Sequence, residues 1–316
     1  MSDSKIFSAI GGQAVIEGVM MRSKTNYAMA VRSPENTIVV VKNALAGTAN
    51  RSKILALPII RGVVALIDSM VLGIKLMTKS ADIAMEEALQ EPSSKFEKWI
   101  EDKLGDKFSD VIVFISVAIA LVLGTGLFML LPAFIASFTN PLIGEHTWVL
   151  GIFEGLLRIG ILVAYVLLIS RMKDVRRVFQ YHGAEHKCIN CLESSRELTV
   201  ENAMLCSRLH KRCGTSFLLF VMIISMVIFF FVRTDVVLLR FGMRILLVPF
   251  IAGLSYEVIR WAGRSDSRFV KLVSVPGLWL QHLTTQEPDK EQLEVAITAL
   301  NEVLEATQDE KQPFTA

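Results

Sequence analysis

The sequence predicts an α-helical membrane protein with about four transmembrane helices and a small cytosolic α+β portion. The chain has 316 residues, 52% of them hydrophobic, and a mean hydropathy of +0.48, which is too apolar for an ordinary soluble enzyme of this size. A helix needs roughly 20 mainly apolar residues to cross a bilayer. Four stretches meet this requirement: 110–138, 148–170, 215–232 and 236–260.

The placement of the basic residues predicts the orientation of the chain. The loop 171–213 carries nine lysine or arginine residues, whereas the opposite loops, 139–147 and 233–235, carry only Arg233. Because cytoplasmic loops are enriched in these residues, we expect a multi-pass protein of the inner membrane with both termini cytoplasmic. The net charge of the whole chain is only +2, so we expect no nucleic-acid partner.

The N-terminal 53 residues are expected to form a small cytosolic β element. Residues 27–32 and 37–42 have the apolar and β-branched composition of strands, and the segment 33–36 between them is typical of a turn, which predicts a β-hairpin. Gly11 and Gly12 precede the hairpin. Such a pair permits either a tight turn into another strand or a close approach of the backbone to another element.

Residues 54–77 are apolar but interrupted by Pro58, Arg61 and Asp68, which makes a full crossing costly, so we expect an interfacial or re-entrant helix there. Near the C-terminus, apolar residues at helical spacing and a capping pair, Asp289 and Gln292, predict an amphipathic helix. The expected segments are the β element (1–53), the interfacial helix and a polar linker (54–109), two membrane helices (110–170), a helical cytosolic metal-site loop (171–214), two membrane helices (215–260) and a cytosolic C-terminal segment (261–316).

The sharpest local signal is the sequence His182-Gly-Ala-Glu-His186. Positions four apart stand on one face of a helix, so the two histidines can bind one metal ion while Glu185 activates a water molecule. This is the His-x-x-Glu-His pattern of one group of zinc enzymes. The alternative is a pair of surface histidines without a metal, and Gly183 weakens the helix prediction.

Two sources of further ligands remain open. His210 and Cys213, three residues apart, would complete a mixed nitrogen and sulfur site suited to zinc or another transition metal. Alternatively, Cys188 and Cys191 would form a structural zinc knot with Cys206 and Cys213, although in a continuous helix the first pair faces away from the histidines. With no secretory signal at the start of the chain, we expect these four cysteines to be reduced in the cytosol.

Charged residues inside the predicted spans are the other unusual feature. Such residues either pair inside the helix bundle or line a polar path, and an interhelical ion pair is the favoured interpretation here. Glu257, at the cytoplasmic end of the fourth span, is a candidate ligand or base, or a partner for Arg260. The charges inside the spans are Glu154, Arg158, Arg240 and Arg244.

Four segments together resemble the YqhQ-like family, a group of bacterial membrane proteins described as metal-dependent enzymes. They are Gly11–Arg22, Tyr181–Lys187, His210–Phe217 and Pro276–Asp289, so the resemblance covers nearly the whole chain. It implies one functional centre that contains His182, Glu185, His186, His210, Cys213, Glu17 and Arg22. It also implies that Cys188 and Cys191 lie outside the family's pattern.

The position of Glu17 between glycines leads to a specific expectation. We expect its carboxylate to lie near the histidines as a ligand or as a partner of a ligand, with Arg22 nearby to bind an anionic group or to pair with an acid. The simpler alternative is a surface ion pair between Glu17 and Arg22.

The first hypothesis for the function is a metal-dependent hydrolase that acts at the cytoplasmic face of the inner membrane on a lipid-like or anionic substrate. His182, His186 and His210 would hold a divalent metal, zinc by preference, Cys213 would complete or flank the site, and Glu185 would activate water. The expected partners are membrane lipids. The alternatives are a non-enzymatic membrane scaffold with a structural metal site and, third, an ion-coupled transporter. Four basic residues follow the second predicted span: Arg171, Lys173, Arg176 and Arg177. They would attract anionic headgroups, or they would serve only to fix the orientation of the chain in the membrane.

Overall fold

The computed structural model describes residues 10–45, 52–85, 108–138, 147–232, 237–262 and 267–309. Its N-terminal part is a four-stranded antiparallel sheet in the order β1 (Gly11–Val15), β2 (Gly18–Arg22), β3 (Asn26–Arg32) and β4 (Ile38–Ala44). The predicted hairpin is confirmed as β3 and β4. The glycine-rich segment adds a second hairpin, which turns through Ile16 and Glu17, and Glu17 adopts a positive φ of 50° in this tight turn.

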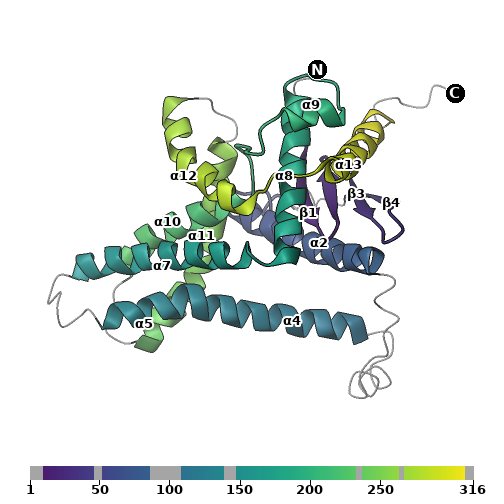
Figure 1. Ribbon diagram of the computed structural model, residues 1–316. Coiled ribbons are helices and arrows are strands. Elements are labelled where there is room, and N and C mark those ends of the chain that lie inside the picture. The colour runs from purple at the N-terminus through teal and green to yellow at the C-terminus, as the bar shows by residue number, and fades with distance from the viewer. Residues whose placement is uncertain are drawn as a thin grey trace.

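Helices cover both faces of the sheet (Figure 1). Alternate side chains of a strand point to opposite faces, so the apolar strand residues form two separate clusters. One face packs against α8 (Lys173–Glu193) and α13 (Lys290–Asp309), and the other packs against Leu76 of α2 (Ile60–Ala84). The residues towards α8 and α13 are Ala14, Val19, Met21, Ala28 and Ala30, and those towards α2 are Val15, Met20, Tyr27, Met29 and Val31.

The apolar helices lie beside this layered part (Figure 1). Within the described residues, three stretches are long and apolar enough to cross a membrane: Val111–Ser137, Val149–Ile169 and Gly242–Ala262. They correspond to α4 (Phe108–Thr125) with the π-helical turn η4 (Gly126–Leu130) and α5 (Leu131–Ser137), to α7 (Thr147–Ile169), and to α11 (Val237–Ala262). The fourth predicted span is α10 (Thr215–Phe231), which is apolar but has only 17 residues, so its crossing stays a prediction.

Helix α2 is a single helix of 25 residues whose first turns pack against α11. A Cβ atom on Gly62 would lie 2.9 Å from the carbonyl oxygen of Gly253, so the two backbones touch where both residues are glycine. Arg61 and Glu257 form an ion pair beside this contact. The start of α2 is therefore fixed to a candidate membrane helix, which agrees with the expected interfacial placement of 54–77 without testing it.

Three more helices complete the fold: α9 (Val200–Met204), α12 (Arg268–Thr284) and α13. The capping pair of α13 is confirmed, because Gln292 N donates to Asp289 Oδ1 at 2.8 Å and Asp289 N donates to Gln292 Oε1 at 3.1 Å. Its apolar side, which includes Leu293 and Leu300, is fully buried against the sheet and α8. The predicted linker at 91–107 lies outside the described residues.

Candidate metal centre

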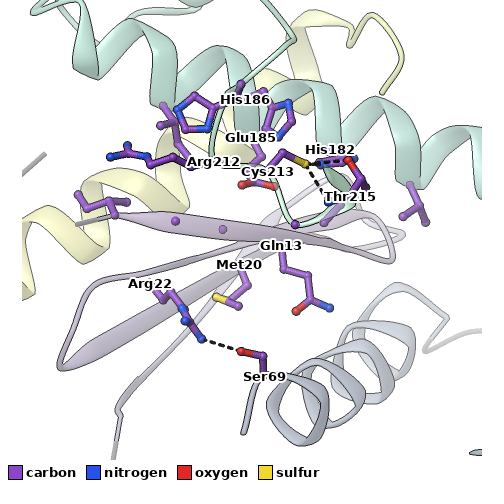
Figure 2. A pocket seen from close by; sticks show the side chains of 18 of the residues that line it. Gln13, Met20, Arg22, Ser69, His182, Glu185, His186, Arg212, Cys213 and Thr215 are labelled. Atoms are coloured by element: carbon purple, nitrogen blue, oxygen red, sulfur yellow. Dashed lines mark hydrogen bonds between the residues drawn. The ribbon is translucent and has the colours of Figure 1, made fainter. Parts of the chain in front are cut away.

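His182 and His186 project from one side of α8, and Cys213 reaches them from the segment just before α10 (Figure 2). A ligand atom from each of these three residues lies within 4.8 Å of the other two. Nε2 of His182 is 3.2 Å from Sγ of Cys213. Nitrogen and sulfur ligands of one tetrahedral zinc ion lie roughly 3.6 Å apart. The three side chains could therefore hold such an ion after small movements.

The surrounding backbone fixes the tautomer of both histidines. Nδ1 of His182 lies 2.8 Å from the carbonyl oxygen of Thr284, and Nδ1 of His186 lies 2.6 Å from that of Arg208. A carbonyl oxygen only accepts, so each Nδ1 carries a proton and each neutral ring keeps its lone pair on Nε2. Partners of this kind orient metal-binding histidines in proteins.

The sulfur of Cys213 is also held in place. The backbone N–H of Thr215 donates to Sγ at 3.3 Å, and the Thr215 hydroxyl lies 3.0 Å from the same atom. Both groups belong to Thr215, the first residue of α10. The start of α10 therefore fixes the position of the sulfur atom.

His210 lies next to this group but is turned away from it. Its ring centroid is 5.7 Å from that of His186, and its Nε2 faces Oε2 of Glu193 at 3.4 Å. Gln281 holds the backbone of His210, because the Gln281 side chain accepts from His210 N and donates to its carbonyl oxygen, both at 2.9 Å. Cys213 belongs to the group of three neighbouring ligand atoms and His210 flanks it, so the role of His210 as a ligand stays a prediction.

Glu185 is almost completely buried beside the histidines, with 5% of its surface exposed. Burial raises the pKa of its carboxyl group, and the nearby His182, His210 and the backbone N–H of Gly12 act in the opposite direction. Burial lowers the pKa of His186 and of His210, which favours the neutral rings that bind metals. The site therefore places the ring of His186, whose neutral form is favoured, next to a buried carboxyl group.

These side chains line a cavity of about 520 Å³ between α8, β1 and α2 (Figure 2). The candidate ligands and Glu185 form one wall, and Arg22 and Ser69 lie on the opposite side. Apolar residues line much of the remainder, among them Ile10, Met20, Leu72, Val178, Phe179 and Ile189. The cavity is large enough for a substrate group beside the candidate ligands.

Glu17 and Arg22 occupy different places. Glu17 forms an ion pair with Arg177 and accepts a hydrogen bond from the hydroxyl of Tyr181 at 3.3 Å, so it meets α8 one residue before His182. The alternative Glu17–Arg22 ion pair is wrong, because Arg22 lines the cavity and donates to Ser69 Oγ at 3.4 Å. Of the two, only Arg22 lies at the candidate site.

The charges within the helix bundle lie apart from the cavity. Glu154 accepts hydrogen bonds from Arg158 at 2.9 Å and from Arg244 at 2.6 and 3.0 Å, which joins α7 to α11 as the favoured ion-pair interpretation expects. The side chain of Arg240 lies outside the described residues. Glu257 pairs with Arg61 and is not among the residues that line the cavity. Arg260 also interacts electrostatically with Glu257, and the expected role of Glu257 as a ligand or base stays a prediction.

The four cysteines of the alternative zinc knot do not form one group, because Cys213 lies apart from the other three. Cys188 lies in the apolar core, and Cys191 donates to the carbonyl oxygen of Glu197 at 3.5 Å. Cys191 also lies next to Cys206, and burial together with this neighbour raises its pKa to about 11. Cys213 is instead with the histidines. In the described part of the chain, the three side chains whose ligand atoms lie close enough to hold one metal ion are His182, His186 and Cys213.

Sequence reasoning missed the residues that hold the centre together. Lys187 and Asn190 donate to four backbone carbonyl groups, one at the end of α9 and three in the loop between α9 and Cys213, and thereby fix this loop against α8. Thr215 and Gln281 hold Cys213 and His210 as described above. Lys187, Thr215 and Gln281 lie in the four segments that carried the family resemblance. That resemblance was the signal in the sequence that could have indicated them.

Comparisons with known proteins agree with that resemblance. The family model described as "Protein of unknown function (DUF1385)" matches residues 57–306. The "Uncharacterized protein YqhQ" of Bacillus subtilis (strain 168) is 38% identical over 309 residues, which cover 96% of this chain and 95% of that protein. No solved structure matches the chain. These names assign neither a metal nor a reaction.

Proposed function

The chain belongs to the YqhQ-like family, described as DUF1385, and from its site we propose that it is a metal-dependent hydrolase at the cytoplasmic face of the membrane. The substrate is a lipid-like molecule with an anionic group. The observation that carries this proposal is the convergence of three ligand atoms next to a buried carboxyl group and a cavity. The ligand atoms without the carboxyl group and the cavity, or the cavity without the ligand atoms, would not suggest a reaction.

The residues present fit a divalent zinc ion. Two imidazole nitrogens with fixed tautomers and one sulfur supply three ligands, and catalytic zinc sites typically use three protein ligands and keep one position open. A zinc ion there would polarise the carbonyl or phosphoryl group that is attacked. His182, His186 and Cys213 all line the cavity, so a substrate group bound there would lie next to the ion that they would hold.

Glu185 supplies the proton transfer. Its carboxylate accepts a proton from the attacking water, whose oxygen forms the new bond to the acyl or phosphoryl centre. The bond to the leaving group then breaks, and Glu185 returns the proton to the leaving oxygen. Its raised pKa supports this role, because a carboxyl group that binds a proton more readily is a better shuttle near neutral pH.

Metal analysis and a lipid-ester assay on the purified full chain test this proposal. Protein prepared without chelators is expected to contain about one zinc ion per chain. His182→Ala should lose zinc and activity, whereas His282→Ala, at an exposed histidine of α12, should keep both. Glu185→Gln should keep zinc and lose activity. Purified protein that contains neither zinc nor any other transition metal would overturn the proposal.

The scaffold with a structural metal site is the second candidate. The candidate ligands contact three separate segments, at Thr284, Arg208 and Thr215. A bound metal would hold these segments together, which favours the scaffold. If the protein is a scaffold, cells that carry Glu185→Gln should grow like the wild type, whereas cells that carry His182→Ala should not. The ion-coupled transporter is the weakest candidate, since Glu154 is already engaged by both described arginines.

A further inference from the structure

A second, shallower cleft opens directly beside the cavity of the candidate metal centre. It has a volume of about 380 Å³ and follows one flank of α2, where Met70, Gly73, Ile74 and Met77 recur at helical spacing. Gln13 and Ser69 line both spaces. The two are therefore neighbours along one path from the outer surface of α2 to the candidate ligands.

Gln13 lies at the junction of the two spaces, between β1 and α2 (Figure 2). A Cβ atom on Gly73 would lie 2.8 Å from Nε2 of Gln13, so the side chain of Gln13 rests against α2 only because residue 73 is glycine. A larger residue at position 73 would displace Gln13 and fill the cleft. This position offers a way to narrow the cleft without changing a candidate ligand.

The outer surface of α2 carries exposed apolar side chains towards the middle of the helix, where Ile67, Met70 and Val71 are 54%, 45% and 63% exposed. Met70 also lines the cleft, and the exposed residues Lys75 and Lys79 follow further along the helix. The helix begins at its glycine contact with α11, which contains a candidate membrane span. An apolar helix face that starts at a membrane helix is typical of a helix lying in the membrane interface. The open side of the cleft would then face lipid.

Arg22 is exposed and places a positive charge beside Ser69, where the cleft and the cavity meet. Among the described residues it forms no ion pair, and the hydrogen bond that it donates to Ser69 is long, at 3.4 Å. Figure 2 shows the guanidinium on the side of the sheet that faces α2, together with Gln13 and Ser69, whereas the candidate ligands lie on the side that faces α8. Arginine binds phosphate oxygens through paired hydrogen bonds, so a phosphate group fits this position.

We infer that the occupant of this path is a membrane lipid with a phosphate headgroup, whose acyl chain lies in the α2 cleft and whose headgroup meets Arg22. This inference rests on the proposed function only where it takes the metal centre as the place of reaction. The binding of the lipid in the cleft does not depend on that function. The lipid reaches the site sideways from the bilayer along α2. Its apolar chain matches the cleft, and its charge matches Arg22.

Photocrosslinking tests this assignment. The full chain is reconstituted in phosphatidylcholine vesicles that contain phosphatidic acid with a diazirine on its acyl chain, and labelled residues are mapped by mass spectrometry. We expect labels on Met70, Ile74 and Met77. Gly73→Leu should reduce them at least fivefold, whereas Gly160→Leu, at an α7 glycine with open space around it, should not.

The headgroup contact is tested with the same mapping. Arg22→Gln should reduce the cleft labelling by phosphatidic acid about fivefold but leave the labelling by an uncharged diacylglycerol probe unchanged. Lys24→Gln, which removes an exposed charge two residues away, is the matched control. Labels spread over α4 and α7, with equal yields in wild type and Gly73→Leu, would overturn the inference.

Zinc measured in the same samples separates the two proposals. Cleft labelling in protein that binds no metal would retain the lipid site and reject the hydrolase. Zinc-loaded protein without cleft labelling would reject the lipid site and leave the hydrolase in place.

Discussion

Gly12 of β1 and Glu185 of α8 are in direct contact at the wall of the cavity. A Cβ atom on Gly12 would lie 2.8 Å from Cγ of Glu185 and equally close to the carbonyl oxygen of Met20. Glycine is therefore required where the sheet meets the buried carboxyl group. The contact links the N-terminal glycine motif to the His-x-x-Glu-His motif, more than 160 residues away in sequence.

Gly12→Ala is expected to destabilise the protein by roughly 1–3 kcal/mol, because the added methyl group forces β1 and α8 apart. The proposed hydrolase activity should fall with it, since Glu185 moves. Gly11→Ala is the matched control, as no atom lies within 4 Å of a Cβ at that position. Thermal unfolding of both variants in detergent measures the difference, and equal melting temperatures would contradict the contact.

Gly183→Ala should destabilise the protein although alanine is the better helix former by about 1 kcal/mol. A Cβ atom there would lie 2.0 Å from the carbonyl oxygen of Gln286, so α8 and the segment before α13 would have to separate. We expect a loss of about 3 kcal/mol in unfolding free energy. An unchanged or raised stability would show that this segment moves freely away from α8.

Removal of the metal should lower the thermal stability of the wild type. Zinc at 100 times its dissociation constant stabilises the folded state by roughly 2.7 kcal/mol. A chelator should therefore lower the melting temperature by several degrees, and added zinc should restore it. Cys213→Ser, with one ligand replaced, should show a much smaller response to either treatment.

The histidines next to the cavity should differ in their effect on metal content. His186→Gln removes a member of the three-ligand group and should abolish stoichiometric zinc binding. His210→Gln should retain zinc, because the His210 ring faces Glu193. Elemental analysis of the two purified variants decides this, and loss of zinc from both would restore His210 as a ligand.

Glu154→Gln tests the ion pairs within the helix bundle. Arg158 and Arg244 are each only 5% exposed, so loss of the shared carboxylate leaves two buried charges without an anionic partner in the described bundle. We expect a loss of roughly 3–5 kcal/mol in unfolding free energy. Glu294→Gln, which breaks the exposed pair with Arg32, should cost under about 1 kcal/mol. Similar costs would mean that the bundle charges are well solvated.

The sequence alone determined the features that depend on local pattern. Apolar length indicated the candidate spans, alternation and turn residues predicted the β3–β4 hairpin, and the Asp289–Gln292 pair predicted the start of α13. The four-residue spacing placed His182 and His186 on one face. Each of these depends on residues that are near neighbours in the chain, so their geometry follows from the periods of helices and strands.

Only the tertiary structure decided which distant residues meet. The chain turns at residues 170–172, so α8 leaves the direction of α7 and crosses the sheet instead of continuing the second span (Figure 1). That crossing brings Gly12 to Glu185 and sends Glu17 to Arg177. His210 and Cys213 are equally plausible ligands by type, and the packing places Cys213 next to His182 and His186 while His210 faces Glu193. Spacing along the chain cannot encode these choices, because they depend on how separate elements pack.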